Sequence, residues 1–376
     1  MKAFPEKLSK KLQERADNNA FRSLQIISEG TDFISNDYLG FSSKKAIHQR
    51  ALHYLKHTNN TNGSTGSRLI SGTHPIHEEV ERIVANFHNS EAALLFNSGY
   101  DANLGLFTAI LEKGTTVIYD ELIHASIRDG IRASNARSLK FKHNDLSDLQ
   151  QKINKSEGAV FIAIEAVYSM DGDQAALKEI CKISQKNDCY LIVDEAHSNG
   201  VFGINGAGLL QELQLENQAF ARVHTFGKAL GCHGAVVLGG KKLRDYLVNF
   251  SRPFIYTTAA SLHSIAVVKA AYCELETTVE IEKLRKNIQY FRKSLQEKKL
   301  KNLFINSHSP IQCCLLSGNS NVKKTADAMN AKNILVKAVL APTVPEGKER
   351  IRICLHSYNT FEEIDSLLTQ LAIFVN

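Results

Sequence analysis

The chain has 376 residues, enough for one large domain and a smaller one, so a single small binding module is excluded. Its 45 Lys and Arg against 39 Asp and Glu give a net charge of +6, spread along the chain without blocks. This mild excess does not predict nucleic-acid binding, although it suits an anionic small molecule. The seven cysteines form no CxxC pair and no zinc-type spacing, which predicts reduced thiols, a cytoplasmic protein and no metal site.

The N-terminal stretch MKAFPEKLSKKLQERADNN is charged and helix-prone without an apolar centre, so we expect no secretion signal. No later run approaches the roughly 18–20 apolar residues of a membrane span, and we expect no membrane association. We assign residues 1–45 to an N-terminal helical segment. Residues 74–89 form the first strongly amphipathic helix, with five apolar side chains on one face: Ile76, Val80, Ile83, Val84 and Phe87.

Residues 46–270 alternate short apolar runs, rich in Val and Ile, with segments of helical period. This pattern is typical of a parallel sheet covered by helices on both faces, and it predicts a large α/β domain. At least six buried strands are expected, at residues 92–96, 115–120, 159–167, 189–196, 221–226 and 234–240.

After about residue 255 the short apolar runs give way to a long helical repeat with a polar face. Residues 271–376 are predicted to form a second, smaller domain. A long helix leads into it, with Ile281, Leu284, Ile288, Phe291 and Leu295 at helical spacing. The remaining apolar stretches read as short strands followed by a terminal helix over FEEIDSLLTQLAIFV. The C-terminal domain is therefore expected to be a small α+β layer.

Ligands in parallel α/β sheets lie at the carboxyl ends of strands, and Lys228 follows one such end in RVHTFGKALGCHGA. A solvated surface lysine is the ordinary alternative, but the flanks here are apolar and glycine-rich, and Thr225 stands three residues upstream. A phosphate-binding P-loop is excluded. The motif needs Ser or Thr directly after the lysine, where Ala229 stands, and a glycine five residues before Gly227, where Arg222 stands. A lysine in such a pocket can form a Schiff base, as pyridoxal phosphate (PLP) requires.

The stretch YLIVDEAHSNGVFG ends a predicted strand at Asp194, with His197 three residues later. A buried aspartate can keep the pyridine nitrogen of PLP protonated, and His197 could reach the ring's phenolic oxygen. A metal pair is the competing interpretation, but a third ligand is missing. The string DEAH also resembles a nucleotide-hydrolysis motif, but the phosphate-binding loop that such a motif requires is missing. We assign no role to Glu195.

Two further strand ends carry candidate residues. His124 follows the strand TTVIYD; alone it would be an ordinary loop histidine, but beside a planar cofactor it could stack on the ring and transfer protons. Ser98, Gly99 and Tyr100 lie between a strand and a helix, where backbone N–H groups make a phosphate seat.

These elements, together with SNDYLGF (35–41), NGSTGSRLISGTH (62–74), EAVYSMDGD (165–173) and APTVPEGKERIRICLHS (341–357), resemble the α-oxoamine synthases. That family contains PLP enzymes of fold type I that condense an amino acid with an acyl thioester. The resemblance implies a large domain with a mostly parallel seven-stranded sheet and a smaller α+β C-terminal domain. It also implies a homodimer with shared active sites.

The resemblance assigns roles residue by residue. Lys228 would carry the Schiff base, His124 would stack on the ring, Asp194 would pair with the pyridine nitrogen, and His197 and Ser169 would face the phenolic oxygen. The phosphate would be held by Ser98, Gly99, Tyr100 and Thr225, with Thr258 of the partner subunit. The amino-acid carboxylate would be bound by Arg352, and other substrate contacts would come from Arg22, Asn36 and Thr343.

TFGKALGCHGAVV, HND (143–145) and the APTVPEG turn look like the branch that joins L-alanine to a pimeloyl thioester of coenzyme A or a carrier protein, in biotin biosynthesis. Leu340 stands where that branch has an arginine near the end of the acyl chain. The resemblance therefore does not fix the identity of the acyl group. Sister enzymes that use glycine or serine are the alternatives. A catalytically silent relative would be expected to lose Lys228 or Asp194, and both are retained.

Overall fold

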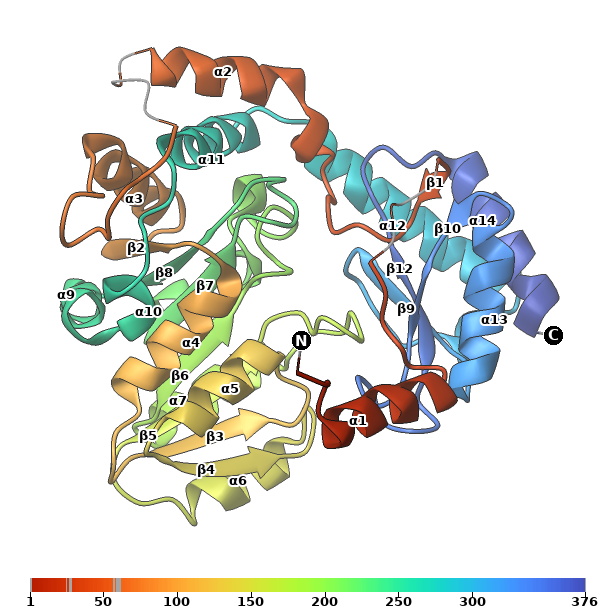
Figure 1. The fold of residues 1–376 in the computed structure, drawn as a ribbon, viewed down its shortest axis with the longest axis horizontal. Helices are drawn as coiled ribbons and strands as arrows, with labels where there is room; N and C mark the ends of the chain where they lie inside the picture. Colours follow the sequence, from red (N-terminus) through yellow and green to blue (C-terminus); the bar gives the residue numbers. More distant parts are fainter. Residues whose placement is uncertain (1, 25, 27–28, 57, 59–61, 376) are drawn as a thin grey trace. The chain divides into compact units, whose positions relative to one another are not determined.

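The computed structural model describes residues 2–24, 26, 29–56, 58 and 62–375 (Figure 1). Contacts within the chain define two compact units. The sheet unit comprises residues 36–169 and 174–282, and the C-terminal unit comprises residues 1–35, 170–173 and 283–376. The first 35 residues thus group with the C-terminal unit, whereas the predicted segments divide the chain at 45 and 270.

The sheet unit is built on one seven-stranded sheet in the order β2-β8-β7-β6-β5-β3-β4. All neighbours run parallel except β8, which is antiparallel to both β2 and β7. The α/β class and the mostly parallel sheet are therefore confirmed. The strands are β2 (Ala92–Phe96), β3 (Thr116–Asp120), β4 (Arg137–Phe141), β5 (Val160–Glu165), β6 (Tyr190–Asp194), β7 (Ala221–Thr225) and β8 (Ala235–Gly239).

Two apolar cores cover the two faces of this sheet, and alternate residues of each strand enter them. On β5, Phe161 and Ala163 belong to one core and Ile162 and Ile164 to the other. Helices α4 and α5 cover the first face (Figure 1), and α6 and α7 contribute to the core on the second. The helices of this unit are α2 (Lys45–Leu55), α3 (Pro75–Phe87), α4 (Gly99–Ile110), α5 (Ala125–Ala133), α6 (Leu146–Ile153), α7 (Leu177–Lys186), α8 (Leu209–Glu212), α9 (Lys241–Phe250), α10 (Arg252–Ile255) and α11 (Leu262–Leu275).

The predicted amphipathic helix is α3. It begins where the His74 side chain accepts the Ile76 backbone N–H and Pro75 occupies the first helical position. Ile76, Val80 and Val84 of the predicted face are fully buried. The six predicted strands are all present, whereas β4 was not predicted. Its sequence RSLKF buries only Phe141, so it lacks the apolar signal of an inner strand.

The C-terminal unit is a small α+β layer, as predicted. Strands β9 (Ile311–Leu315), β11 (Lys337–Val339) and β12 (Arg350–Cys354) form an antiparallel sheet in the order β11-β12-β9, and β1 (Thr31–Asp32) pairs with β10 (Ile334–Leu335). Its helices are α1 (Glu6–Asp17), α13 (Asn319–Asn330) and α14 (Phe361–Val375), and α12 (Glu280–Glu297) enters it from the sheet unit. Short 3₁₀ turns are η1 (Phe41–Ser43), η2 (Ile204–Gly206), η3 (Glu216–Gln218) and η4 (Lys301–Leu303).

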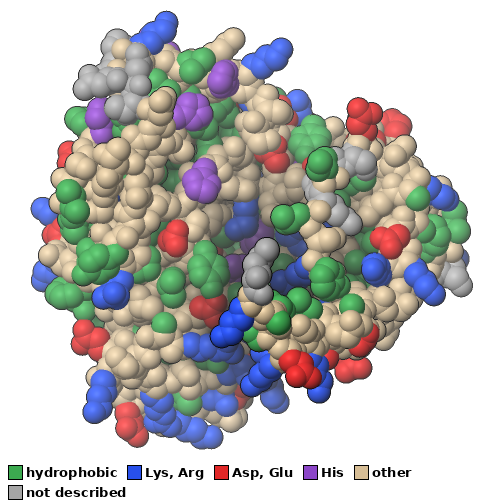
Figure 2. Space-filling model, in the orientation of Figure 1, with side chains coloured by type: hydrophobic (Ala, Val, Ile, Leu, Met, Phe, Trp, Pro, Cys, Tyr) green, Lys and Arg blue, Asp and Glu red, His purple; other side chains and the backbone are tan. Residues whose placement is uncertain are grey.

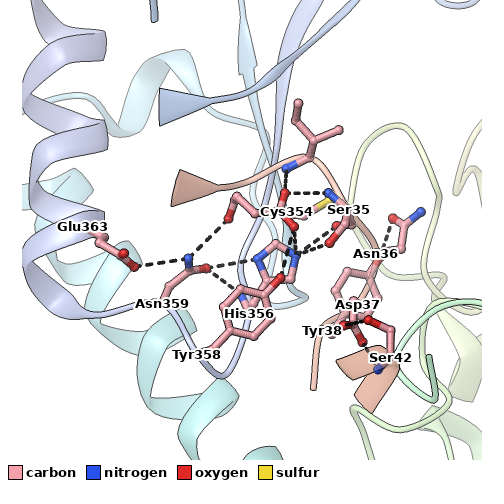
Figure 3. A network of polar contacts seen from close by, with 12 residues as sticks. Ser35, Asn36, Asp37, Tyr38, Ser42, Cys354, His356, Tyr358, Asn359 and Glu363 are labelled. Carbon is pink, nitrogen blue, oxygen red and sulfur yellow. Dashed lines mark hydrogen bonds and ion pairs between the residues drawn. The ribbon is translucent and has the colours of Figure 1, made fainter. Parts of the chain in front are cut away.

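Side-chain hydrogen bonds attach the N-terminal segment to the C-terminal strands of its own unit (Figure 3). The His356 ring lies between Ser35, whose Oγ is 3.1 Å from Nε2, and Asn359, whose Oδ1 is 3.1 Å from Nδ1. The Cys354 backbone N–H donates to the Phe33 carbonyl at 2.9 Å. These bonds explain why a segment so distant in sequence belongs to this unit.

A buried polar cluster joins the ends of β6 and β7 on the face opposite α4. Glu195 follows β6, and its Oε1 accepts the Ser198 hydroxyl at 2.8 Å and the Leu210 backbone N–H at 3.1 Å. Its Oε2 lies 3.3 Å from Nε2 of His224 on β7, and both side chains are fully buried. The His224 ring in turn packs on His88, with ring centroids 4.2 Å apart.

Charge stabilises this cluster. Burial raises the pKa of Glu195, but its interactions with His224 and Arg222 outweigh burial and leave the pKa below its usual value. Burial, followed by the charges of His224 and Arg222, holds the pKa of His88 far below its usual value, so His88 is neutral. Its Nδ1–H therefore donates to the Ala207 carbonyl at 2.9 Å, and its Nε2 accepts the Tyr272 hydroxyl at 2.8 Å.

Replacing Glu195 by alanine should lower the free energy of unfolding by roughly 3–5 kcal/mol, because the buried Arg222 guanidinium loses the carboxylate that offsets its charge, and the Ser198 hydroxyl and Leu210 N–H lose their acceptor. Urea denaturation at neutral pH measures this change, with Glu179→Ala on the exposed side of α7 as control. Because the folded-state pKa of Glu195 is lowered, its contribution is present above about pH 4.3 and is lost as the pH falls through the folded value. A cost equal to that of the control would contradict the assignment.

Candidate active site

A cavity of about 260 Å³ opens at the carboxyl ends of β5, β6 and β7, and all its lining residues belong to the sheet unit. It brings together many residues that the sequence predicted for one site, namely Asn36, Ser98, Gly99, Tyr100, His124, Asp194, His197, Thr225 and Lys228. It also contains residues that were not predicted, among them Asn103, Ser126, Glu165 and His233.

Lys228 lines this cavity and is half-buried. Its Nζ donates a hydrogen bond to Thr225 Oγ1 at 3.1 Å. The backbone around it is anchored by buried apolar neighbours, including Ala229 and Leu230. Gly231 adopts φ +60°, and a Cβ there would lie 2.2 Å from the Ser42 backbone nitrogen, so only glycine permits this approach. Lys228 is thus fixed in a pocket, unlike an ordinary surface lysine.

Asp194 ends β6 and is almost fully buried at the cavity wall. Its Oδ2 accepts a hydrogen bond from Asn103 Nδ2 at 2.7 Å, and its Oδ1 accepts the Ala196 backbone N–H at 2.9 Å. These two donors fix the orientation of the carboxylate.

His124 caps α5 and is connected to Asp194 through two side chains. Its Nδ1 accepts the Ser126 backbone N–H at 3.2 Å and lies 2.7 Å from Ser126 Oγ, which accepts from Asn103 Nδ2 at 3.0 Å. Burial lowers the pKa of His124, the Asp194 charge opposes this, and the Lys228 charge adds to it. The neutral ring therefore carries its proton on Nε2, and the Ser126 hydroxyl donates to Nδ1.

His197 and Asn36 line the cavity and are connected by Tyr38. The Tyr38 hydroxyl lies 2.8 Å from His197 Nδ1 and donates to Asn36 Oδ1 at 3.2 Å. Figure 3 shows Asn36 and Tyr38 beside Asp37, which accepts the Ser42 hydroxyl at 2.5 Å. The SNDYLGF stretch thus supplies both a cavity residue and the support for His197.

The predicted phosphate seat is the first turn of α4. Ser98 caps this helix by accepting the Asp101 backbone N–H at 3.1 Å. A Cβ on Gly99 would lie 2.4 Å from Thr225 Cγ2, so glycine lets the helix start approach Thr225 closely. The first backbone N–H groups of a helix have no partner within it and attract anions.

The cavity therefore contains an amine, a buried carboxylate, a neutral imidazole and a helix start with free backbone donors. These are the groups that a pyridine ring, its aldehyde and a phosphate would each require. The residues present fit PLP.

Five predicted residues lie elsewhere. Ser169 adjoins the cavity without lining it, and its backbone N–H donates to Glu165 Oε2 at 3.1 Å. Thr258 is exposed outside the cavity, and its carbonyl accepts from Asn97 Nδ2 at 2.8 Å.

The predicted substrate residues Arg22, Thr343 and Arg352 belong to the C-terminal unit, so their approach to the cavity stays a prediction. Arg22 Nη2 donates to Thr343 Oγ1 at 3.3 Å, which brings the two predicted acyl contacts together. Arg352 is almost fully buried on β12, where its Nη1 lies 2.9 Å from Cys354 Sγ.

Sequence reasoning missed Asn103, Ser126 and Glu165. Glu165 is the last residue of β5, so the rule that polar strand ends approach the ligand could have identified it. Asn103 lies one helical turn after Gly99, and Ser126 directly follows the predicted loop around His124. Only the fold shows that these two connect His124 with Asp194.

Among the described residues, no three His, Cys, Asp or Glu side chains gather in a way that could hold a metal ion. No helix in the same part of the chain combines the length and apolar character needed to cross a membrane. Charged side chains are scattered over the face shown in Figure 2, as the sequence composition suggested.

Comparison with known proteins supports the same chemistry. An 8-amino-7-oxononanoate synthase from Emericella nidulans is 42% identical over 398 residues, which cover 99% of this chain and 96% of the relative. An 8-amino-7-oxononanoate synthase from Lysinibacillus sphaericus is 31% identical and covers 97% of each chain.

Two solved structures superpose closely. Serine palmitoyltransferase from S. paucimobilis, with a bound PLP–myriocin aldimine, has a TM-score of 0.88 at 26% identity, covering 98% of this chain and 96% of the other. The 8-amino-7-oxononanoate synthase from Francisella tularensis has a TM-score of 0.80 at 31% identity, covering 92% and 98%. The fold is therefore fold type I, as predicted.

The sequence model of the aminotransferase class I and II family matches residues 28–371. These matches extend over almost the whole chain and both units. The chain therefore belongs to the aminotransferase class I and II family and, within it, to the α-oxoamine synthases.

Proposed function

We propose that this protein is a PLP-dependent acyltransferase that condenses L-alanine with a pimeloyl thioester to give 8-amino-7-oxononanoate, the free thiol and carbon dioxide. The observation that carries the proposal is the convergence of Lys228, Asp194 and His124 on one cavity. The names of relatives that match over almost the whole chain support the choice of substrates. Coenzyme A and a carrier protein are both suitable thiols, and biotin biosynthesis is the expected pathway in a cytoplasmic enzyme.

Bound PLP supplies an electron sink for the carbanion that forms at the amino-acid Cα. Lys228 would hold the cofactor covalently and, once released, would act as the base that removes the Cα proton. Asn103 and the Ala196 backbone orient Asp194, whose carboxylate would pair with the pyridine nitrogen. His124 presents its ring face and its Nε2–H to the reacting groups.

Other residues bind and orient the substrates. The first turn of α4, with Thr225, would hold the phosphate, and His197, with Ser169 adjoining the cavity, would serve the phenolic oxygen. Arg352 binds the alanine carboxylate, and Arg22, Asn36 and Thr343 contact the acyl substrate. Thr258 completes the phosphate site of the partner subunit in a homodimer, since it lies outside the cavity of its own chain.

A second candidate function is condensation with glycine or serine in place of alanine. Two observations favour it: the close superposition on serine palmitoyltransferase, and Leu340 near the expected acyl end.

Lys228→Ala should abolish the covalent attachment of PLP. The measurement is borohydride reduction of the purified protein with PLP, followed by mass spectrometry of its peptides. The wild type should carry one pyridoxyl group on Lys228, and the variant should carry none there. Lys178→Ala, at an exposed site on α7, is the matched control and should label like the wild type. Label on another lysine in the wild type would refute the assigned role.

Alanine should be the preferred amino acid. Thiol release from pimeloyl-coenzyme A, measured separately with alanine, glycine and serine, should be fastest with alanine, and the product should have the mass of 8-amino-7-oxononanoate. Faster turnover with glycine or serine would replace the proposal by the second candidate. A panel of acyl thioesters with and without a terminal carboxylate tests whether the chain tolerates Leu340 in the pimeloyl reaction.

A further inference from the structure

Glu165 is a buried acid of the cavity to which neither the sequence motifs nor the proposed roles give a task. It ends β5 and pairs in register with Asp194 on the adjacent parallel strand, so both carboxyl groups point to the same face of the sheet. Its side chain lines the cavity, and the residue is only 3% exposed.

The two acids are unequally supplied with hydrogen-bond donors. Asp194 accepts one bond on each oxygen, from Asn103 and from the Ala196 backbone. Glu165 accepts the Ser169 backbone N–H on Oε2, whereas its buried Oε1 has no hydrogen-bond partner among the described residues. A buried ionised carboxylate needs several donors, so the ionised form of Glu165 is poorly stabilised here.

Burial and the neighbouring charge also disfavour the ionised form of Glu165. Burial, and after it the Asp194 carboxylate, raises the pKa of Glu165 well above its usual value, although Lys228 and the Ser169 and His124 backbones oppose the rise. The Ser169 N–H occupies Oε2, which leaves Oε1 as the oxygen that can carry a proton. A neutral Glu165 would thus present a carboxylic O–H at the cavity wall.

The proposed reaction needs such a donor, as its balance shows. Zwitterionic alanine, the thioester and one proton give the amino ketone with a protonated amine, a thiol and carbon dioxide. A bond forms between alanine Cα and the thioester carbonyl carbon, the carbon–sulfur bond breaks, and the carboxylate leaves as carbon dioxide. The reaction protonates two groups, the departing thiolate and the Cα that loses its carboxylate, and the proton taken from Cα can serve only one of them, so the site needs a second proton donor.

We propose that Glu165 enters the reaction as a neutral acid and supplies the second proton from Oε1 inside the cavity. The inference rests on the proposed condensation. Water then returns a proton to Glu165 once the products leave. Asp194, with a hydrogen-bond donor on each oxygen, stays available for the pyridine nitrogen throughout.

Glu165→Gln tests this role, because glutamine keeps the shape and the acceptor for the Ser169 N–H but has no acidic proton. The variant should fold, keep the pyridoxyl label on Lys228, and lose about 10²-fold or more in kcat with alanine and pimeloyl-coenzyme A. A purely structural role predicts wild-type kcat, since glutamine satisfies the same backbone donor. Glu179→Gln is the surface control.

Infrared spectroscopy of the protein without PLP gives a readout independent of activity. At neutral pH the wild type should show a carboxylic-acid C=O band that shifts in D₂O and is missing in Glu165→Gln. The pH dependence of stability gives a second test. Relative to Glu165→Gln, the free energy of unfolding of the wild type should fall as the pH rises above about 4.3, because the unfolded chain ionises Glu165 there whereas the folded chain keeps its proton. If the glutamine variant does not fold, Glu165→Asp should move the band without removing it.

The outcomes separate the two proposals. Absence of the band, or a glutamine variant with wild-type kcat, overturns the role of Glu165 and leaves the proposed condensation standing. A wild type that shows the band but carries no label on Lys228 overturns the condensation, and with it the reaction that Glu165 would serve.

Discussion

The alignment of β5, β6 and β7 as parallel neighbours is the constraint on which the site depends. It brings three strand ends to one edge, and the two-residue alternation of side chains assigns each residue there to one face. Glu165, Asp194 and Thr225 share the face covered by α4 and α5, where the cavity lies. A shift of one residue in the pairing of β5 with β6, or of β6 with β7, would move a carboxylate from the cavity to the opposite face of the sheet.

The same alternation explains the two adjacent acids of the DEAH stretch. Asp194 faces the cavity, and Glu195 faces the other side of the sheet, where it meets His224 from the next strand. Thr225, which follows His224, returns to the cavity and accepts the hydrogen bond from Lys228. The buried Glu195–His224 contact therefore joins the two strand ends that carry Asp194 and Thr225, from behind the site.

The sequence could predict most of the fold because the inner strands are continuous apolar runs and α3 carries an apolar stripe. It missed β4, whose polar edge sequence contains a single buried side chain, Phe141. In the site, Lys228, Asp194 and His124 were predictable because each follows a strand within a recognisable motif. Asn103 was not, because its importance comes from one hydrogen bond to Asp194 across 91 positions of the chain. Glu195 could not be interpreted without the contact to a neighbouring strand.

His124 and, as proposed, Glu165 both offer an acidic proton at the cavity wall, and their chemistry suits them to different tasks. Because Ser126 occupies Nδ1 of His124, the ring offers only its Nε2–H, and a neutral imidazole N–H polarises an oxygen by hydrogen bonding without readily losing its proton. A neutral carboxylic acid beside Asp194 gives up its proton far more easily. His124 is thus suited to hold a developing oxyanion, and the proposed neutral Glu165 to donate a proton to carbon. Supplying Asp194 with two donors and Glu165 with one is the arrangement that permits both tasks in one cavity.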